Sequence, residues 1–219
     1  MSARGRIDKR QAILAAAGEV FAREGYALAG VDVIAAEAGV AKPTVYNHFG
    51  DKETLFREAI AADADRALAK HLAVVAELRD GNDLRATLER VGHHMLVCHC
   101  EDRSVALRRL LSAEVTRFPD LIDIVRGHAA DRVTEALADR LARLALAGRL
   151  RRLDPTQAAE QFIALLTGPI EARSRLGTRP VPDDELWAVA RAAVDTFLRA
   201  FGDQAAARSS APVADTPGE

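Results

Sequence analysis

The chain of 219 residues is long enough to bury a sizeable core, as one domain or as a small domain joined to a larger one, and too long for a mini-protein. Apolar residues make up 49% of it and aromatic residues only 5%, which is typical of an all-α protein and unfavourable for a β-sandwich or barrel. The 30 Lys and Arg stand against 32 Asp and Glu, so any nucleic-acid binding must depend on a local basic surface.

The cysteine content and the length of the apolar runs indicate the cellular compartment of the protein. Cys98 and Cys100 are too few for a disulfide framework and are compatible with a reducing environment. No uncharged apolar stretch approaches the roughly 18 to 20 residues that a membrane span needs. We therefore expect a cytoplasmic protein that does not enter the membrane.

Apolar residues recur at helical spacing along most of the chain, with glycines and prolines between the segments. A charged, flexible arm over residues 1–8 leads into the first helix, which Gly25 ends. Asp51 caps a long helix, another helix starts at Asp83, and Pro169 predicts a kink in the next-to-last helix. The predicted helices cover residues 7–24, 31–38, 43–48, 52–78, from 83 onward, 103–115, 119–127, 129–147, 155–176 and 184–202.

The predicted helices divide the chain into three parts. Residues 1–52 form a small N-terminal domain of three helices, and residues 53–202 form a larger helical domain. Residues 203–219 are rich in Ser and Pro and poor in apolar bulk, so we expect a disordered tail.

Residues 31–49 have the layout of a helix-turn-helix, in which two steeply crossed helices need a small residue at their contact and a glycine in the turn. Ala35, Gly39 and Val45 occupy the small, turn and inward-pointing positions. The second helix carries a cation, a hydroxyl, a phenol, an amide and an imidazole, all able to bond phosphates or base edges. The alternatives are an ordinary polar helix face, with Asn47 as a cap and Tyr46 half-buried.

These residues also resemble a known family. The sequence Gly-Val-Ala-Lys-Pro-Thr-Val-Tyr-Asn-His-Phe at 39–49, followed by Asp-Lys-Glu-Thr-Leu-Phe at 51–56, is similar to the DNA-binding signature of the tetracycline-repressor (TetR) family of transcriptional regulators. The resemblance implies an N-terminal helix-turn-helix domain and a helical ligand-binding and dimerisation domain. It places on the major groove Lys42, Pro43, Thr44, Tyr46, Asn47 and His48, with Tyr46 and His48 largely on phosphates, and places Lys52 on the DNA backbone.

The chain departs from the family pattern at two positions that often carry a hydroxyl. Gly30 and Ala41 stand there, so the caps or phosphate contacts that those oxygens would supply are lost. Arg4 and Arg6 belong to a group of four cations within the first ten residues, as expected for an arm that follows phosphates or enters a minor groove. The alternative is a terminus that only aids solubility.

The larger domain is expected to pair with a second subunit and to hold an effector. The helix at 184–202 presents an apolar surface too wide for one stripe, so together with the helix at 155–176 it predicts a four-helix homodimer interface. The effector is unknown; the apolar excess favours a small, largely apolar organic molecule that lowers affinity for double-stranded operator DNA. The predicted ligand-binding residues are Leu88, His94, Met95, Cys98, Leu111, Phe118, Phe162 and Leu166.

Other functions remain open alternatives at this point. His94, Cys98 and Glu101 lie on one helix face and form a partial site for a metal ion, although Cys98 also continues an apolar seam, and thiol sensing is a further possibility. The runner-up function is a helical small-molecule or metal-binding protein whose helix-turn-helix is only structural. The sequence carries no nucleophile elbow, phosphate-binding loop or His-Glu-x-x-His motif, so we expect neither an enzyme nor a resident cofactor or metal.

Overall fold

The computed structural model describes residues 3–78 and 83–203. Within them the structure is helical apart from an isolated β-bridge between Leu150 and Gly202, which confirms the predicted all-α fold. The predicted tail lies outside the described residues except for Asp203. The elements are α1 (Ala3–Leu28), α2 (Val31–Glu37), α3 (Lys42–Phe49), α4 (Lys52–Val75), α5 (Leu84–Cys100), α6 (Asp102–Glu114), α7 (Leu121–Val125), the π-helical turn η1 (Arg126–Ala130), α8 (Asp131–Leu146), α9 (Pro155–Arg173) and α10 (Asp183–Phe201).

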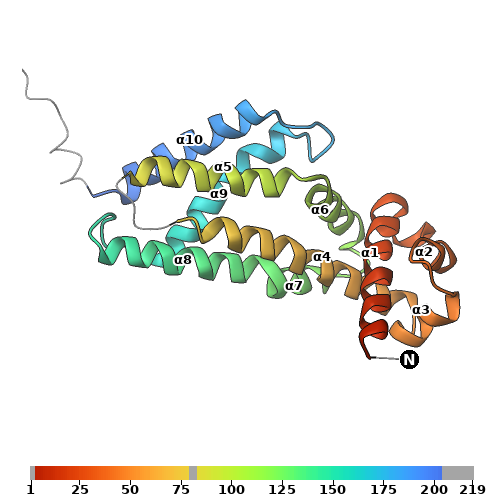
Figure 1. Cartoon of the computed structure of the whole chain (residues 1–219). Helices are drawn as coiled ribbons and strands as arrows, with labels where there is room; N and C mark the ends of the chain where they lie inside the picture. Colours follow the sequence, from red (N-terminus) through yellow and green to blue (C-terminus); the bar gives the residue numbers. More distant parts are fainter. Residues whose placement is uncertain (1–2, 79–82, 204–219) are drawn as a thin grey trace, which may run out of the picture.

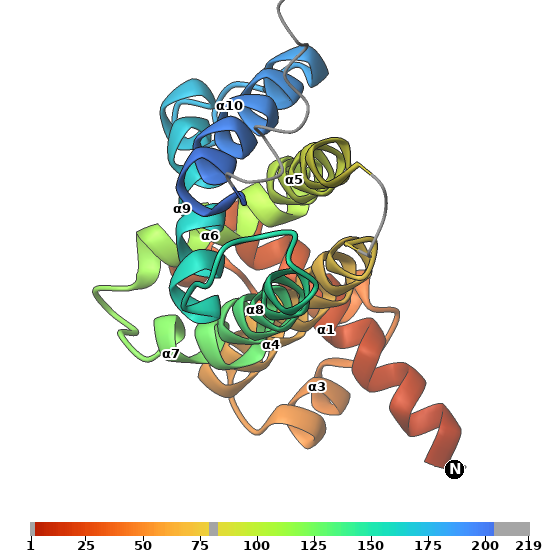
Figure 2. The same ribbon diagram turned by 90° about the vertical axis from the view of Figure 1, so that its left-hand side faces the viewer.

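The molecule is elongated, with a head at one end and a body that forms the rest. Helices α1 to α3 make up the head, and α4 leads from it into the body (Figure 1). Viewed along the molecule, α4, α5 and α8 lie roughly parallel to its long axis, and α10 runs obliquely to them (Figure 2). Helix α10 packs against α5 and α9, and α8 packs against α9 and α4.

Two hydrophobic cores hold these parts together. The body core joins α5, α8, α9 and α10, whereas the head core joins α1, α2 and α3 with the first turns of α4. Helix α6 also contributes to the head core, through Leu107, Leu110 and Leu111. Each fully buried apolar side chain stabilises the fold by roughly 1.5 to 3 kcal/mol, so the shared core fixes α6 firmly to the head.

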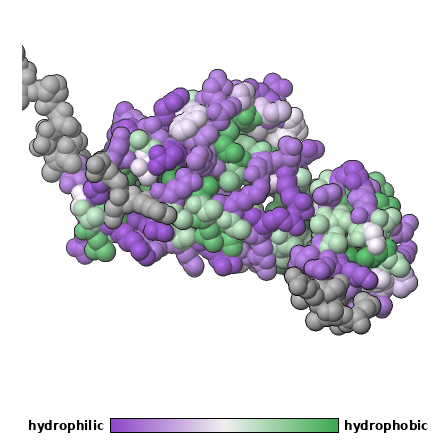
Figure 3. Space-filling model, viewed as in Figure 1, coloured by the Kyte–Doolittle hydropathy of each residue, from purple (hydrophilic) through white to green (hydrophobic). Residues whose placement is uncertain are grey.

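Four aromatic rings lie at the centre of the head core. The Tyr26 and Phe118 ring centroids are 4.7 Å apart, and those of Phe21 and Phe56 are 4.9 Å apart. Phe118, predicted as a ligand-binding residue, thus packs against Tyr26 of α1 and Phe56 of α4. Hydrophilic residues cover most of the surface around the cores, with smaller hydrophobic patches between them (Figure 3). No helix in the described ranges has an apolar stretch long enough to cross a bilayer.

Side-chain caps explain where several helices begin. The Asp51 carboxylate accepts a hydrogen bond from the Thr54 amide at 2.6 Å, and the Asp83 carboxylate accepts one from the Ala86 amide at 2.9 Å. A cap of this kind stabilises a helix by about 1 kcal/mol. Gly30 and Ala41 precede α2 and α3 without a side-chain cap, as their residue types predict.

Several predicted helix ends are wrong. Helix α1 begins at Ala3, so residues 3–8 continue a helix instead of forming a flexible arm; the charge of this segment does not prevent helix formation. Gly25, at φ 73°, breaks the helical geometry as predicted, but a further turn follows. Helix α4 ends at Val75, and the segment predicted as 119–127 is the short α7 followed by η1.

Helix α9 stays helical through Pro169 and ends at Arg173, three residues earlier than predicted. Two residues soon after it, Arg175 and Leu176, have φ of 50° and 56°, and this left-handed backbone ends the helix.

Most of the apolar surface predicted on α10 is covered within this one chain, while Trp187 and Leu198 stay half-buried. Leu186, Val189, Val194 and Phe197 are buried inside this one chain, because α10 lies against two helices and each covers part of its apolar face. The outward face carries small residues instead. They are Ala188, Ala192, Thr196 and Ala200.

Candidate DNA-binding surface and ligand cavity

The turn between α2 and α3 has the geometry that the motif requires. Gly39 adopts φ 66°, a left-handed conformation that favours glycine, and a Cβ added there would meet nothing within 4 Å. The requirement is therefore conformational and not steric. The Val40 amide donates to the Ala35 carbonyl at 2.9 Å, and the Ala35 and Val45 side chains are buried between the helices.

One side of α3 is buried and the other faces solvent. Val45 and Phe49 point into the head core, while Lys42, Pro43, Tyr46 and Asn47 are exposed. The side chains of Thr44 and His48 are half-buried at the border. Asn47 lies inside the helix and is not a cap, whereas Tyr46 is 42% exposed, so more than half of its surface is covered.

Two lysines near this surface are held by weak contacts. The Lys42 ammonium lies 3.9 Å from an Asp32 carboxylate oxygen, an exposed pair that contributes little to stability. The Lys52 ammonium donates to the Ala27 carbonyl at 3.4 Å and lies 4.7 Å from the centre of the Tyr26 ring. Both can therefore exchange these partners for phosphates. The side chains of Arg4 and Arg6, predicted to contact DNA, lie outside the described residues.

Contacts from α1 and α4 hold α3 in place. Arg10 of α1 forms an ion pair with Glu58 of α4, and its guanidinium lies 5.4 Å from the centre of the Phe49 ring of α3. One side chain thus joins three helices. This arrangement gives the polar face of α3 a fixed position relative to the body.

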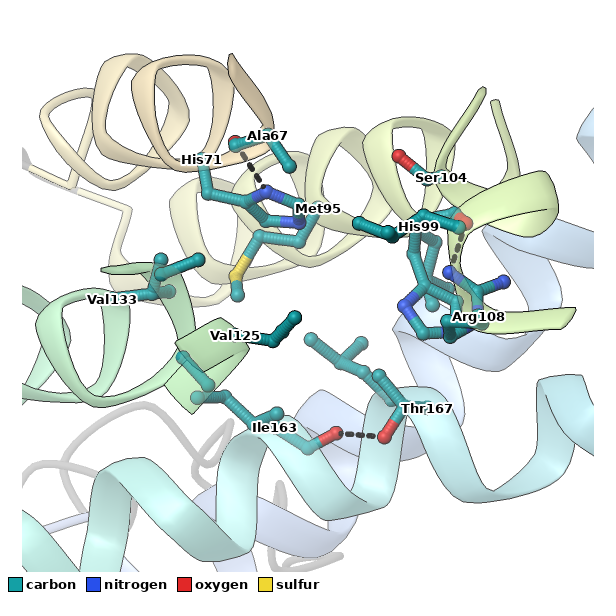
Figure 4. A pocket seen from close by; sticks show the side chains of 15 residues that line it. Ala67, His71, Met95, His99, Ser104, Arg108, Val125, Val133, Ile163 and Thr167 are labelled. Carbon is teal, nitrogen blue, oxygen red and sulfur yellow. Dashed lines mark hydrogen bonds between the residues drawn. The ribbon is translucent and has the colours of Figure 1, made fainter. Parts of the chain in front are cut away.

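A cavity of about 250 Å³ lies in the body, lined by residues of α4, α5, α6, α8, α9 and the segment around η1. Its two ends differ in chemistry (Figure 4). Met95, Val125, Val133 and Ile163 surround one end, and His99, Arg108, Ser104 and Thr167 surround the other. The full lining is Ala67, His71, Met95, Leu96, His99, Ser104, Leu107, Arg108, Val125, Ala129, Ala130, Val133, Ile163, Leu166 and Thr167.

Two of the eight predicted ligand-binding residues, Met95 and Leu166, line this cavity. The structure places Leu88, Cys98 and Phe162 inside the body core.

The remaining three predicted ligand residues also lie away from the cavity. His94 is hydrogen-bonded to Glu77 at 3.2 Å and partly exposed, whereas Leu111 and Phe118 pack in the head core. None of these six residues lines this cavity, because helical periodicity identifies the buried face of a helix but not which buried side chains border a void; Leu111 lines a separate, larger groove.

The polar side chains of the cavity were not among the ligand-binding residues predicted from the sequence. His71, His99, Ser104, Arg108 and Thr167 were not predicted, although they supply its hydrogen-bonding groups. One signal was present in the sequence. Arg108 directly follows Leu107 and lies on the same helix face as Leu111, three residues later. A cation therefore stands within an apolar stripe of this helix.

At the polar end of the cavity, a neutral histidine lies beside an arginine. Burial lowers the pKa of His99 to about 4, and the nearby charges of Arg108 and His71 act in the same direction, so His99 is neutral at pH 7. Its Nε2 atom is buried and has no hydrogen-bond partner among the described residues. Arg108 donates from Nη1 to the His99 carbonyl at 2.8 Å. At the other end of the cavity, beside Met95 (Figure 4), His71 Nδ1 donates to the Ala67 carbonyl at 2.9 Å.

The residues proposed for a metal site do not converge. His94 contacts Glu77, Glu101 forms an ion pair with Lys70, and Cys98 is buried in the body core. The described residues contain no group of three or more His, Cys, Asp or Glu side chains arranged to hold a metal ion. Burial raises the pKa of both cysteine thiols, which lowers their thiolate fraction at neutral pH.

Helix α6 connects the cavity to the head. Its Arg103 guanidinium donates to the buried Asp63 carboxylate of α4 at 3.0 Å and lies 3.6 Å from Glu19 of α1. At its other end, Glu114 accepts a hydrogen bond from the Tyr26 amide of α1 at 3.0 Å. The same helix supplies Arg108 to the cavity, so α6 contacts the cavity as well as α1 and α4.

Two family models match the chain. Residues 13–59 match the model of bacterial regulatory proteins of the tetR family, and residues 86–203 match that of the AefR-like transcriptional repressor C-terminal domain.

Among proteins of known sequence, the chain is 31% identical over 138 residues to the HTH-type transcriptional activator FasR of Mycolicibacterium smegmatis. This match covers 63% of this chain and 61% of that protein. It is 34% identical over 132 residues to the uncharacterized HTH-type transcriptional regulator YfiR of Bacillus subtilis, covering 52% of this chain and 64% of that protein. The chain thus matches less than two thirds of the length of either relative.

Solved structures agree with this assignment over nearly the whole chain. A TetR-family regulator from Mesorhizobium loti superposes with a TM-score of 0.84 at 27% identity, covering 93% of this chain and 100% of that one. The flavonoid-responsive regulator FrrA superposes with a TM-score of 0.68 at 26% identity, covering 90% and 98%. With the outward polar face of α3 and the helical body behind it, these matches show that the chain belongs to the TetR family of transcriptional regulators.

Proposed function

We propose that this transcriptional regulator is a cytoplasmic homodimer that binds a pseudo-palindromic operator and is released from it by a small, largely apolar effector. The observation that carries this proposal is the combination of an outward polar recognition helix with an internal cavity, joined by α6. The DNA-binding domain is proposed to comprise residues 1–52, completed by the first turns of α4. Residues 53–202 are proposed as the effector-binding and dimerisation domain.

The polar face of α3 supports DNA binding by direct contact. Lys42 and Thr44 stand at the start of the helix, where they can reach base edges and phosphates in the major groove. Tyr46 and His48 are proposed to bind phosphates, and Lys52 the backbone beside them. One such short helix reads only a few base pairs, so two heads related by a two-fold axis supply the specificity.

The proposed dimer interface uses the outward faces of α9 and α10. Small side chains at Ala188, Ala192, Thr196 and Ala200 follow one side of α10, and Ala164 and Gly168 are exposed on α9. Small residues let two helices approach closely, which suits a four-helix interface between two subunits. The family assignment supports the pairing, since regulators of this family dimerise on their operators.

The direction of regulation rests on the matched C-terminal family, which is described as a repressor domain, although the Mycolicibacterium relative is named as an activator. Ligand entry beside Arg108 would move α6 and alter the spacing of the heads. Linked sites of this kind are usually coupled by about 1 to 3 kcal/mol, so effector and operator should weaken each other's binding about 5- to 150-fold.

A gel-shift titration with the DNA upstream of the protein's own gene tests this function. We expect a two-fold symmetric footprint, and sedimentation of the free protein as a dimer at micromolar concentration. Absence of a specific shift, with a folded dimer and an occupied cavity, would favour the alternative, a helical small-molecule-binding protein whose helix-turn-helix is only structural. A monomer combined with a footprint that lacks two-fold character would contradict the dimer.

A further inference from the structure

Arg108 presents a positive charge to a largely apolar cavity without a carboxylate partner. One N–H of its half-buried guanidinium donates to the His99 carbonyl, and no carboxylate of the described residues forms an ion pair with it. Glu171 and Cys100 act on it only at longer range. Other partly buried arginines, Arg103 and Arg179, are paired with carboxylates. Removing a charge from water without a partner is unfavourable, so this position suits an anion from outside the chain.

His99 adds a second unsatisfied group at the same end of the cavity. Its buried Nε2 atom lacks a partner, and Figure 4 shows the imidazole beside the Arg108 side chain. The neutral ring has one N–H to donate, and the guanidinium has donors besides the one bonded to the carbonyl. Together they match a carboxylate, which accepts several hydrogen bonds and binds most strongly to cationic donors.

The two residues also stand where the cavity meets a larger open groove. This groove, of about 1050 Å³, lies among α1, α6, α9 and the loop after α9, and its lining includes both His99 and Arg108. The polar end therefore borders both the cavity and the groove. A ligand bound with its charged group at this end places its hydrocarbon part in the apolar end of the cavity.

The volume of the whole cavity limits the size of the ligand. A cavity of about 150 Å³ holds one benzene ring, so about 250 Å³ accommodates roughly six to nine carbon atoms. Met95, Val133, Ile163 and Leu166 provide apolar contacts at this end, and the imidazole of His71 lies beside Met95 (Figure 4). A short alkyl chain or a single ring on a two-carbon spacer fills this space.

We propose that the effector of this regulator is a small amphipathic monocarboxylate, with its carboxylate bound by Arg108 and His99 and its hydrocarbon body in the apolar end of the cavity. The inference rests on the proposed function only in giving the cavity an effector role. It narrows the effector from any apolar molecule to an organic acid.

Calorimetric titration of the full-length protein with hexanoate, octanoate and 3-phenylpropanoate, each against its primary amide, tests this ligand class. The amides keep the shape and remove the charge. We expect at least one acid to bind with one molecule per subunit, about tenfold or more tightly than its amide. Arg108→Gln, which keeps a donor for the His99 carbonyl, should abolish that preference. Arg132→Gln removes an exposed charge from α8 that lines neither the cavity nor the groove, so it should retain the preference.

Three outcomes would overturn the inference: no binding of any of the acids at millimolar concentration, equal affinity for acid and amide, or an unchanged preference in a folded Arg108→Gln protein. Gel shifts on the same samples separate this from the proposed function. Acids that bind without changing operator affinity support the ligand class and contradict effector-controlled release. Intact operator binding with no acid binding contradicts only the ligand class.

Discussion

Lys42 and Thr44 carry the proposed contacts to DNA. Neither side chain belongs to the buried core of the head, so removing either one should leave the head folded. Thr44 is half-buried and Lys42 has only a weak exposed pair with Asp32. Replacing either by Ala should weaken operator binding by about 1 to 3 kcal/mol, and Lys42→Ala should also reduce the salt dependence by about one phosphate contact. Fluorescence anisotropy over a range of salt concentrations measures both effects.

Arg132→Ala is the matched control for these two variants. It removes an exposed charge from α8, in the body of the molecule, and should leave operator affinity unchanged. If both head variants bind with wild-type affinity while circular dichroism is also unchanged, the recognition surface has been assigned to the wrong face.

His99 makes the stability of the body depend on pH. Its pKa of about 4 in the folded chain lies below the ordinary 6.5, so between these values the unfolded chain binds more protons and stability falls as the pH is lowered. The full difference amounts to about 3 kcal/mol. The effect is absent above pH 6.5 and complete below pH 4.

Denaturant unfolding at pH 7 and pH 4.5 measures this contribution. Wild type and His99→Gln contain the same carboxylates. The difference between their losses of unfolding free energy from pH 7 to pH 4.5 therefore gives the contribution of the His99 imidazole. The variant should lose about 2 kcal/mol less than wild type over this interval. Equal losses would show that His99 titrates normally in the folded chain.

Helix α6 is the element that joins cavity and head. Its Arg103 binds the buried Asp63, and Asp63 also accepts from Arg66, so Arg103→Gln removes the link to α6 without leaving the carboxylate unpaired. We expect operator binding to persist and the coupling between effector and operator to fall by about 0.5 to 2 kcal/mol.

The measurement is the operator affinity with and without saturating effector. Arg85→Gln serves as the control, because it breaks an exposed pair with Asp195 between α5 and α10. Unchanged coupling in the Arg103 variant would show that the signal reaches the head by a different contact, such as that of Glu114 with Tyr26.

At the scale of the whole molecule, the proposed dimer depends on close approach of two small-residue faces. Ala192→Glu places a charge in the middle of the α10 face, while the residues that pack α10 inside the chain stay unchanged. We expect sedimentation as a monomer and operator binding weakened about 100-fold or more, because the two heads lose their bivalent attachment.

Ala69→Glu makes the same substitution at an exposed position on α4 and should remain dimeric. A dimeric Ala192→Glu protein with full operator affinity would place the interface elsewhere.

The sequence by itself determined the helices, the capping residues Asp51 and Asp83, and the recognition segment. These features depend on neighbours within a few residues: apolar spacing, a carboxylate before a helix, or a glycine in a tight turn. The exposed and buried sides of α3 followed from the same local pattern, since Val45 and Phe49 alternate with polar residues at helical spacing.

Only the tertiary structure decided which buried residues face a void and which fill a core. Leu111 and Phe118 belong to the head core because α6 and the segment after it pack against the head. Phe162 packs against Phe197 because α9 and α10 are in contact. The polar residues of the cavity come from four separate helices, and their meeting is invisible to periodicity. A cavity is a mismatch in volume between packed elements, so it depends on how those elements are placed and not on the pattern within any one of them.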